Sequence, residues 1–381
     1  MIGLVVNPVA GIGGPAGLAG SDGAEVQRLA VARGAHSRAR ERARIAMQVL
    51  AARRPSLVIA TAADAMGADA VRSAGLVPWV VHSTESGPSS GMTAAADTSA
   101  AVAALAAAGA GLILVAGGDG TLRDAAAGLA RTAAAPPAVL GIPAGVKMYS
   151  PVFAVSPRAA GALAAEWIDG VLPTADREVL DVDEVAMRHA RVDPVLHGML
   201  RVPFRIGRTQ SRKAATPTSE VAAVAAAARG VVRRMRPDTR YLLGPGSTTA
   251  EIARQLGIRK SPLGVDVILD RRLLLAAGSE QQLLAEVAQG PAQAVVTVIG
   301  GQGFLLGRGN QQLSASVIRA LGEDPLMVVA PEQKLIDLHG LPLIVETGDA
   351  EIDARLSGHI RIVTGVATTS LYAVAAPDTD L

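Results

Sequence analysis

The chain has 381 residues, of which 50% are hydrophobic and only 2% aromatic, and its formal net charge is +2. This length predicts two domains, and no dense run of basic residues interleaved with aromatics marks the chain as a dedicated nucleic-acid binder. The absence of cysteine excludes disulfides, thiolate catalysis and cysteine-based zinc sites, and the six histidines are too widely spaced to predict a histidine-rich metal site.

The amino terminus, M-I-G-L-V-V-N-P, has no basic segment before its apolar residues and is not typical of a signal peptide. Residues 100–118 carry no charge, but they are mostly alanine and glycine. Gly109 and Gly111 divide them, which predicts a helix, a turn and a strand rather than a membrane span. We therefore expect a cytoplasmic protein without a membrane partner.

The first half of the chain alternates short apolar segments with helical ones. Strands are expected at residues 2–7, 57–60, 77–82, 112–116 and 139–142. Helices are expected at residues 37–53, 65–74, 93–108, 122–133 and 156–170. This alternation predicts a parallel sheet covered on both faces, and such sheets bind ligands at the carboxyl ends of their strands.

The glycine-rich segment N-P-V-A-G-I-G-G follows the first expected strand. It lacks the G-K-[ST] of a P-loop and the spacing of a dinucleotide-binding fingerprint. The segment still favours a phosphate- or nucleotide-facing loop over a flexible surface loop. The candidate contacts are Asn7, Gly11, Gly13 and Gly14.

A second glycine loop, G-G-D-G-T at residues 117–121, follows the fourth expected strand. Glycines let phosphate oxygens approach backbone N–H groups, which makes Gly117, Gly118, Gly120 and Thr121 candidate phosphate contacts. A carboxylate there would repel phosphates unless it binds Mg²⁺ or accepts a proton from a hydroxyl nucleophile. Asp119 is therefore the candidate catalytic residue, and a plain Asp-Gly turn is the alternative.

The middle of the chain carries two further candidate sites. Lys147, in G-I-P-A-G-V-K-M-Y-S, either neutralises a phosphate or is a solvated surface residue. Residues 178–183 and 196–204 are expected to be extended, and a helix is expected at 216–235. The run D-V-D-E at 181–184 either lies on a solvated strand edge or binds ribose hydroxyls or a cation.

The alternation returns after residue 240. Strands are expected at 241–243, 265–269, 294–299, 326–329 and 343–345. Helices are expected at 249–256, 280–289, 314–321 and 333–338. In G-P-G-S-T-T-A-E, Ser247 and Thr248 either cap a helix or contribute to an anion site at its terminus.

A long glycine-rich run, V-I-G-G-Q-G-F-L-L-G-R-G-N-Q-Q-L-S, follows the strand expected at 294–299. Its donors Gln302, Arg308, Asn310 and Gln311 suit a polar ligand. A structural connector is the alternative.

Together these motifs resemble a known family. G-G-D-G-T after an apolar strand is the shared signature of the NAD kinase and diacylglycerol kinase superfamily. N-P-V-A-G-I-G-G, G-I-P-A-G-V-K-M-Y-S-P-V-F-A and G-G-Q-G-F-L-L-G-R-G-N-Q-Q-L-S are similar to the branch of ATP-NAD kinases, or polyphosphate/ATP-NAD kinases, that includes the acetoin-catabolism protein X group. The motifs span nearly the whole chain.

The resemblance implies an α/β fold with two domains. The first, at residues 1–177, would be a parallel-sheet, nucleotide-phosphate-binding domain like those of NAD kinases and diacylglycerol kinases. The second, at residues 178–381, would be a mixed α/β substrate-binding domain. Its last segment either stays in that domain or returns to the first.

The resemblance also implies residue roles. Asp119 would act as the base that activates the acceptor hydroxyl. Asp183 and Glu184 are similar to the pair that contacts the nucleoside in NAD kinases, and Ser247 and Thr248 lie in a G-S-T-T-A similar to their G-S-T-A-Y. Mg²⁺ would be held by the phosphates of the donor, with a contact to Asp119 left open.

Three departures from the family pattern bear on the substrate. Asp183 stands where better-known enzymes have asparagine, and no tyrosine follows G-S-T-T-A. Ala19 replaces a lysine that is usual in this branch. The α/β alternation after residue 240 also differs from the β-rich second domain of well-known NAD kinases.

The function implied is a small-molecule kinase. It would transfer a phosphoryl group from ATP or polyphosphate to the 2′-hydroxyl of the adenosine ribose of NAD, giving NADP. Two alternatives stay open: a kinase of another hydroxylated metabolite in a catabolic, acetoin-type pathway, and a non-catalytic nucleotide-binding regulator. NAD and ATP are the expected ligands, no nucleic-acid partner is expected, and homo-oligomerisation is left open.

Overall fold

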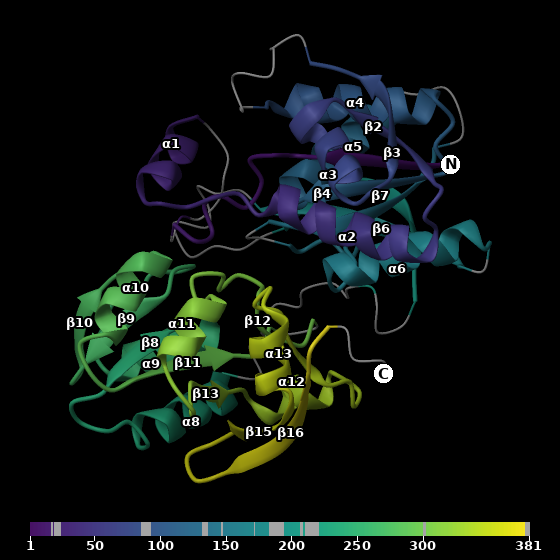
Figure 1. Cartoon of the computed structure of the whole chain (residues 1–381). Helices are drawn as coiled ribbons and strands as arrows, with labels where there is room; N and C mark the ends of the chain where they lie inside the picture. Colours follow the sequence, from purple (N-terminus) through teal and green to yellow (C-terminus); the bar gives the residue numbers. More distant parts are fainter. Residues whose placement is uncertain are drawn as a thin grey trace.

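The structure is a computed structural model of the chain. It describes residues 1–16, 18, 24–84, 93–131, 136–145, 148–170, 172–182, 194–205, 209, 221–299 and 302–377. Two sheets dominate it, one in the upper and one in the lower part of the view in Figure 1.

The first sheet has five strands in the order β3-β2-β1-β4-β5, and all neighbouring pairs are parallel. The strands are β1 (Ile2–Val6), β2 (Val58–Ala62), β3 (Val77–His82), β4 (Leu112–Gly117) and β5 (Ala138–Pro143). Every residue of β1, β4 and β5 is buried. The prediction of a parallel sheet from apolar runs is confirmed, because central strands covered on both faces have no polar side to show.

Helices cover both faces of this sheet. They are α2 (Ala39–Arg53), α3 (Ala68–Ser73), α4 (Ala95–Ala107), α5 (Asp119–Leu129) and α6 (Pro157–Ile168), with the 3-10 turn η1 (Asp64–Met66) before α3. The short helix α1 (Ala24–Ala32) lies to the side of the sheet (Figure 1). Helices α2 and α6 pack together on one face, and α4 and α5 pack together on the other.

Small residues make this packing close. A Cβ on Gly161 of α6 would lie 2.3 Å from the carbonyl oxygen of Ala46 in α2, and a Cβ on Gly128 of α5 would lie 2.4 Å from that of Ser99 in α4. A chain poor in aromatic residues thus brings its helix backbones together through glycine and alanine.

The antiparallel pair β6 (Thr174–Val182) and β7 (Pro194–Pro203) forms a separate two-stranded sheet. It packs against β5 and α5 of the first half of the molecule. Extended segments were predicted here, and the strands confirm them. This hairpin brings the end of β6 to the first turns of α5.

The second sheet has nine strands in the order β10-β9-β8-β11-β13-β15-β16-β14-β12. They are β8 (Arg240–Leu243), β9 (Asp266–Leu269), β10 (Arg272–Leu275), β11 (Ala292–Thr297), β12 (Phe304–Leu306), β13 (Leu326–Val329), β14 (Leu343–Val345), β15 (Gly358–Val363) and β16 (Thr369–Ala375). Parallel and antiparallel pairs both occur, so this half is mixed α/β as predicted.

The helices of this half are α8 (Val221–Val232), α9 (Ser247–Gln255), α10 (Glu280–Val287), α11 (Ala315–Ala320), α12 (Glu332–Ile336) and α13 (Ala350–Leu356). The five strands predicted here are confirmed as β8, β9, β11, β13 and β14, but β10, β12, β15 and β16 were missed. β12 has only three residues inside a glycine-rich run, and β10 follows β9 after only two residues. β15 and β16 carry exposed polar residues that dilute the apolar pattern.

One strand links the two halves. Phe304 of β12 is fully buried and belongs to the apolar core of the first sheet, although β12 is an edge strand of the second.

In the described part of the chain, no helix is long and apolar enough to cross a membrane.

Candidate active site

The candidate site lies where the connections of the first sheet reverse direction. From β1 the chain continues to β2 and β3 on one side, and β4 and β5 lie on the other. The loops after β1 and β4 therefore diverge at the carboxyl edge of the sheet, and ligands of open α/β sheets bind at such a point. Asn7 and the segment Gly117–Thr121 both lie there, as the sequence predicted.

G-G-D-G-T is not an open loop. Gly117 ends β4, Gly118 precedes α5, and Asp119 is the first helical residue. The expected helix start at residue 122 was therefore wrong by one turn. The misplacement arose because the first apolar residue was used to mark the start, whereas an aspartate is itself favoured in the first turn of a helix.

Thr121 fixes the shape of this turn. A Cβ on Gly117 would lie 2.3 Å from Thr121 Oγ1, so only glycine leaves room for that side chain. Asn7 Nδ2 donates a hydrogen bond to Thr121 Oγ1 at 3.1 Å, and Asn7 Oδ1 accepts one from the backbone N–H of Val9 at 3.2 Å. The structure thus joins two of the predicted site residues directly.

Asp119 is buried, with an exposed fraction of 2%. Its carboxylate accepts hydrogen bonds from the backbone N–H of Tyr149 at 2.5 Å and of Ser150 at 3.1 Å, and from Ser150 Oγ at 2.6 Å. Burial raises the pKa of Asp119 to about 7, against the lowering effect of these hydrogen bonds. The charge of Asp181 raises it further.

An arginine with two acidic partners lies beside Asp119. Arg123, one turn farther along α5, forms ion pairs with Asp181 at 2.8 Å and with Asp124 at 3.2 Å. Ser150 Oγ accepts a hydrogen bond from the backbone N–H of Leu180, at 3.0 Å, which ties β6 to the same place. The site therefore includes a half-buried guanidinium close to the candidate base.

Sequence reasoning did not single out Arg123, Tyr149 or Ser150. The spacing of Arg123, four residues after Asp119, could have placed both on one helix face once the helix start was known. The two donors to Asp119 lie 30 and 31 residues away in the chain, and no local pattern links them to it.

The remaining predicted residues of the first glycine loop pack inward. A Cβ on Gly11 would lie 1.9 Å from the carbonyl oxygen of Ala144, and its φ of +73° also favours glycine. Gly13 and Gly14 are buried, and the N–H of Gly14 donates to the carbonyl of Gly11 at 3.1 Å. The loop after β1 thus packs onto the loop after β5.

The donors of the 302–311 run also reach the loop after β5. Gln302 donates to the carbonyl oxygen of Met148 at 3.0 Å, Gln311 to that of Gly145 at 2.9 Å, and Arg308 to that of Val155 at 2.7 Å. Asn310 instead holds its own loop, by donating to the carbonyl oxygen of Leu305 at 2.7 Å.

Ser247 and Thr248 lie in the first turn of α9 in the second half, which starts two residues earlier than expected. Neither caps the helix, because Gly246 takes that position without a side-chain bond. Ser247 is exposed, whereas Thr248 is fully buried and its hydroxyl has no hydrogen-bond partner among the described residues. Lys147, Asp183 and Glu184 lie outside the described residues.

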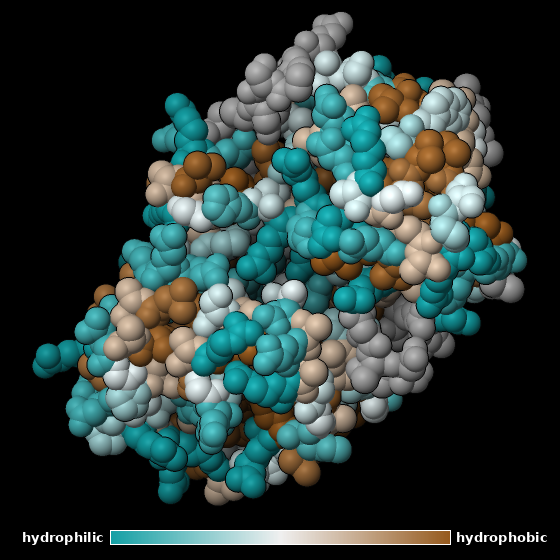
Figure 2. Space-filling view, viewed as in Figure 1, coloured by the Kyte–Doolittle hydropathy of each residue, from teal (hydrophilic) through white to brown (hydrophobic). Residues whose placement is uncertain are grey.

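Charged side chains from both halves meet between the two sheets, where Figure 2 shows a hydrophilic hollow. A cavity of about 350 Å³ there is lined by Arg38 and Arg42 of the first half and by Glu346 and Thr347 of the second, among others. This part of the boundary between the halves is therefore polar, whereas Phe304, Ile299 and Ile344 of the second half pack against the apolar core of the first sheet.

The described residues contain no group of three or more histidine, aspartate or glutamate side chains that could hold a metal ion. Both oxygens of Asp119 already accept hydrogen bonds from the protein. Mg²⁺ therefore fits this site only if phosphate oxygens supply most of its ligands, as is usual where it accompanies a nucleotide.

Comparison with known families agrees with this geometry. Residues 2–171 match the model of the ATP-NAD kinase N-terminal domain, and residues 236–374 match that of the ATP-NAD kinase C-terminal domain. No curated protein and no solved structure matches the chain. The two family matches cover most of the sequence and both sheets, and the chain therefore belongs to the ATP-NAD kinase family.

Proposed function

We propose that the protein is an NAD kinase. It transfers a phosphoryl group from ATP or polyphosphate to the 2′-hydroxyl of the adenosine ribose of NAD, giving NADP. Membership of the family supports phosphoryl transfer. The observation that carries the proposal is Asp119, a buried carboxyl group with its pKa raised to about 7, at the start of a helix on the carboxyl edge of the sheet. A general base works best when its pKa lies near the operating pH.

In the reaction, ionised Asp119 accepts the proton of the attacking hydroxyl. The bond from that oxygen to the transferred phosphorus forms as the bond to the leaving phosphate breaks. The backbone N–H of Tyr149 and the Ser150 hydroxyl hold the carboxylate in place. Because hydrogen bonding to the charged form favours it, they also limit the rise in its pKa.

The phosphates of the donor are assigned to the first turn of α5 and the loops beside it. Free N–H groups at a helix start, including those of Gly120 and Thr121, attract phosphate oxygens. Gly118 and Asn7 flank this turn, and Arg123 supplies positive charge nearby. Mg²⁺ bound to the phosphates would neutralise part of their charge. Lys147 is a further candidate for the same task.

The NAD nucleoside is assigned to residues outside that turn. Asp183 and Glu184 follow β6 in the chain. Leu180, within β6, donates a backbone hydrogen bond to Ser150. Ser247 and Thr248 remain candidates in the second half. These assignments rest on the resemblance of D-E and G-S-T-T-A to family motifs.

The decisive experiment measures NADP formation by the purified protein with Mg²⁺, ATP or polyphosphate, and NAD. Asp119→Asn should reduce turnover by about 10²–10⁴-fold, because it keeps the shape of the side chain and removes the base. Its circular dichroism spectrum should match that of the wild type, which shows that the fold is intact. Near-normal turnover of this variant would remove Asp119 from the mechanism.

A second candidate is a kinase of another hydroxylated metabolite, in a catabolic pathway of the acetoin type. Its support is the resemblance to the acetoin-catabolism group, together with Ala19 in place of the usual lysine and the divergent second half of the chain. A screen of small polyols and hydroxyketones with ATP and Mg²⁺ tests it. Turnover of one of them above that of NAD would favour this function.

A nucleotide-binding regulator without catalysis is the third candidate. Its support is Ala19, in place of a lysine usual in this branch. Binding of NAD or ATP in calorimetry, with no phosphorylated product from any acceptor, would favour it.

A further inference from the structure

We propose that Arg308 is a positioning residue, which together with Glu346 and Arg42 holds the segment Met148–Val155 against Asp119. The proposal rests on the proposed function of Asp119. It replaces the expectation that Arg308 binds substrate.

The Arg308 side chain is occupied by the protein itself. It is 2% exposed, and it donates to the carbonyl oxygen of Val155 and to Met148 Sδ, both at 2.7 Å. Its guanidinium also lies over the ring of Phe304, 4.7 Å from the ring centre. Two groups of the 148–155 segment and one aromatic face thus surround a single cation, which leaves little surface for a ligand.

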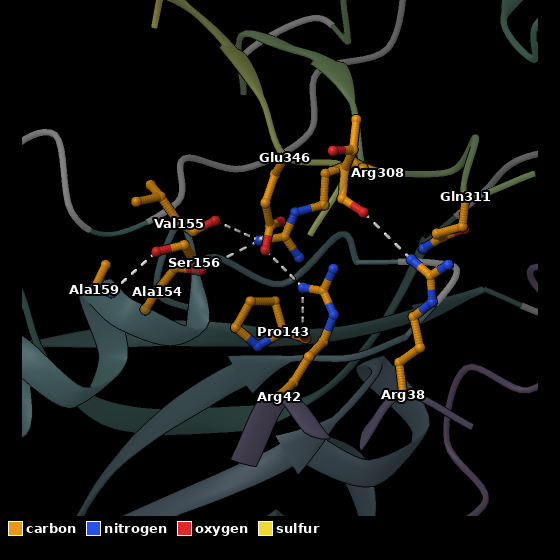
Figure 3. Close-up of polar contacts among 12 residues, drawn as sticks. Arg38, Arg42, Pro143, Ala154, Val155, Ser156, Ala159, Arg308, Gln311 and Glu346 are labelled. Carbon is orange, nitrogen blue, oxygen red and sulfur yellow. Dashed lines mark hydrogen bonds and ion pairs between the residues drawn. The ribbon is translucent and has the colours of Figure 1, made fainter. Parts of the chain in front are cut away.

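The charge of Arg308 is balanced by Glu346 of the same half, and Glu346 also binds an arginine of the first half. Glu346, which follows β14, lies 3.9 Å from Arg308 and accepts a hydrogen bond from Arg42 of α2 at 2.8 Å. Arg42 also donates to the carbonyl oxygen of Pro143 at 2.9 Å. Figure 3 shows Arg42 rising from the first half to meet Glu346 and Arg308 of the second. The three side chains form one buried cluster that joins both halves.

The position of Arg308 is set by its neighbour. Gly307 has a φ of +92°, and a Cβ there would lie 2.1 Å from the carbonyl oxygen of Glu346. Only glycine allows so close an approach to the end of β14. The loop therefore presents Arg308 and Glu346 together.

The segment Met148–Val155, which Arg308 contacts, is also the one that binds the candidate base Asp119. Gln302 and Arg308 contact Met148, and Arg308 contacts Val155. Tyr149 and Ser150, between these two points, supply the hydrogen bonds to Asp119. A small displacement of this segment would move the carboxylate without touching a substrate, and misplacement by about 1 Å can lower a rate by about 100-fold.

Arginine and lysine are not equivalent in this role. A planar guanidinium can donate to several acceptors at once and stack on a ring, whereas an ammonium keeps only the charge. Arg308→Lys therefore removes the geometry and retains the charge, and Glu346→Gln removes the charge of its partner and retains the shape.

The test compares Arg308→Lys and Glu346→Gln with the wild type. Both variants should lower kcat for NADP formation about tenfold or more and leave KM for NAD and ATP within about twofold. The control is Arg240→Lys, at an arginine–glutamate pair with Glu286 in the second half, 3.2 Å apart, and it should change neither constant. A rise in KM with kcat unchanged would assign Arg308 to substrate binding and overturn the proposal, as would wild-type constants in both variants.

Hydrogen exchange makes the test independent of activity. The amides of Tyr149 and Ser150 should be protected in the wild type and should exchange at least tenfold faster in Arg308→Lys, with no change in Arg240→Lys. Unchanged protection would overturn the positioning role even if the protein phosphorylates another acceptor. If NADP fails to form but exchange responds as expected, the positioning role of Arg308 holds and only the proposed NAD kinase activity fails.

Discussion

Asp119 must be ionised to accept a proton, and its surroundings act on its ionisation in opposite directions. Burial raises the pKa of the carboxyl group to about 7, while the hydrogen bonds from Tyr149 and Ser150 lower it. The ionised fraction therefore grows as the pH rises through about 7. We expect kcat to increase over this range and then level off, measured as initial rates of NADP formation at saturating substrates. A flat profile would contradict the assignment of Asp119 as the base.

Ser150 makes a second prediction at this scale. Its hydroxyl donates to Asp119, so Ser150→Ala removes a bond that favours the ionised form and should shift the pH profile toward alkaline values. At neutral pH, kcat should fall severalfold. Ser73→Ala, at a hydroxyl that bonds to the carbonyl oxygen of Ala70 in α3, serves as the control. A profile unchanged by Ser150→Ala would show that its hydroxyl does not tune the base.

The raised pKa of Asp119 also affects folding. Between the usual aspartate pKa of 3.8 and about 7, the carboxyl group is ionised in the unfolded chain but still protonated in the native state. The native state then binds more protons, so the free energy of unfolding falls as the pH rises across this window. Asp119→Asn removes this titration. Urea unfolding at about pH 5 and pH 7.5 should show a smaller loss of stability in the variant than in the wild type, and equal losses would contradict the shift.

At the scale of elements, the contact between α2 and α6 depends on one missing side chain. Gly161→Ala would put a Cβ 2.3 Å from the backbone of Ala46 and force the helices apart, which costs about 1–3 kcal/mol for an overpacked core. Gly111→Ala is the control, because the nearest atom to its Cβ would be 3.8 Å away. Thermal melts of both variants measure the difference. A Gly161→Ala variant as stable as the control would mean that the helices can separate freely.

The sequence predicted elements well where burial imposes a pattern and poorly where it does not. β1, β4 and β5 of the first sheet are fully buried apolar runs, whereas β15 and β16 carry exposed residues such as His359 and Leu371. For the site too, the sequence predicted only residues that a local pattern marks. Asn7, Asp119 and Thr121 were predicted because each lies next to a strand end, but Tyr149 and Ser150 were not, since only the folded chain brings them to Asp119.

At the scale of the whole molecule, polar and apolar contacts join the two halves differently. The cluster of Arg42, Glu346 and Arg308 is buried, and removing one partner of such a pair typically costs about 3–5 kcal/mol, while the intact pair adds little net stability. We therefore expect the cluster to fix the orientation of the two halves rather than to add net stability. The net stabilisation between the halves must come mainly from apolar burial, which points to Phe304.

Phe304 tests whether the halves share one core. Although it lies on β12 of the second sheet, its ring is buried with the first sheet, whereas Leu306 on the same strand belongs to the core of the second.

Phe304→Ala should lower the free energy of unfolding by about 3–5 kcal/mol, and Leu306→Ala by about 2–5 kcal/mol. Native-state hydrogen exchange should show the loss from Phe304→Ala in the amides of β4 and β5, and the loss from Leu306→Ala in those of β11 and β13. If Phe304→Ala left β4 and β5 fully protected, the first sheet would not depend on this ring, and the idea of a shared core at Phe304 would be wrong.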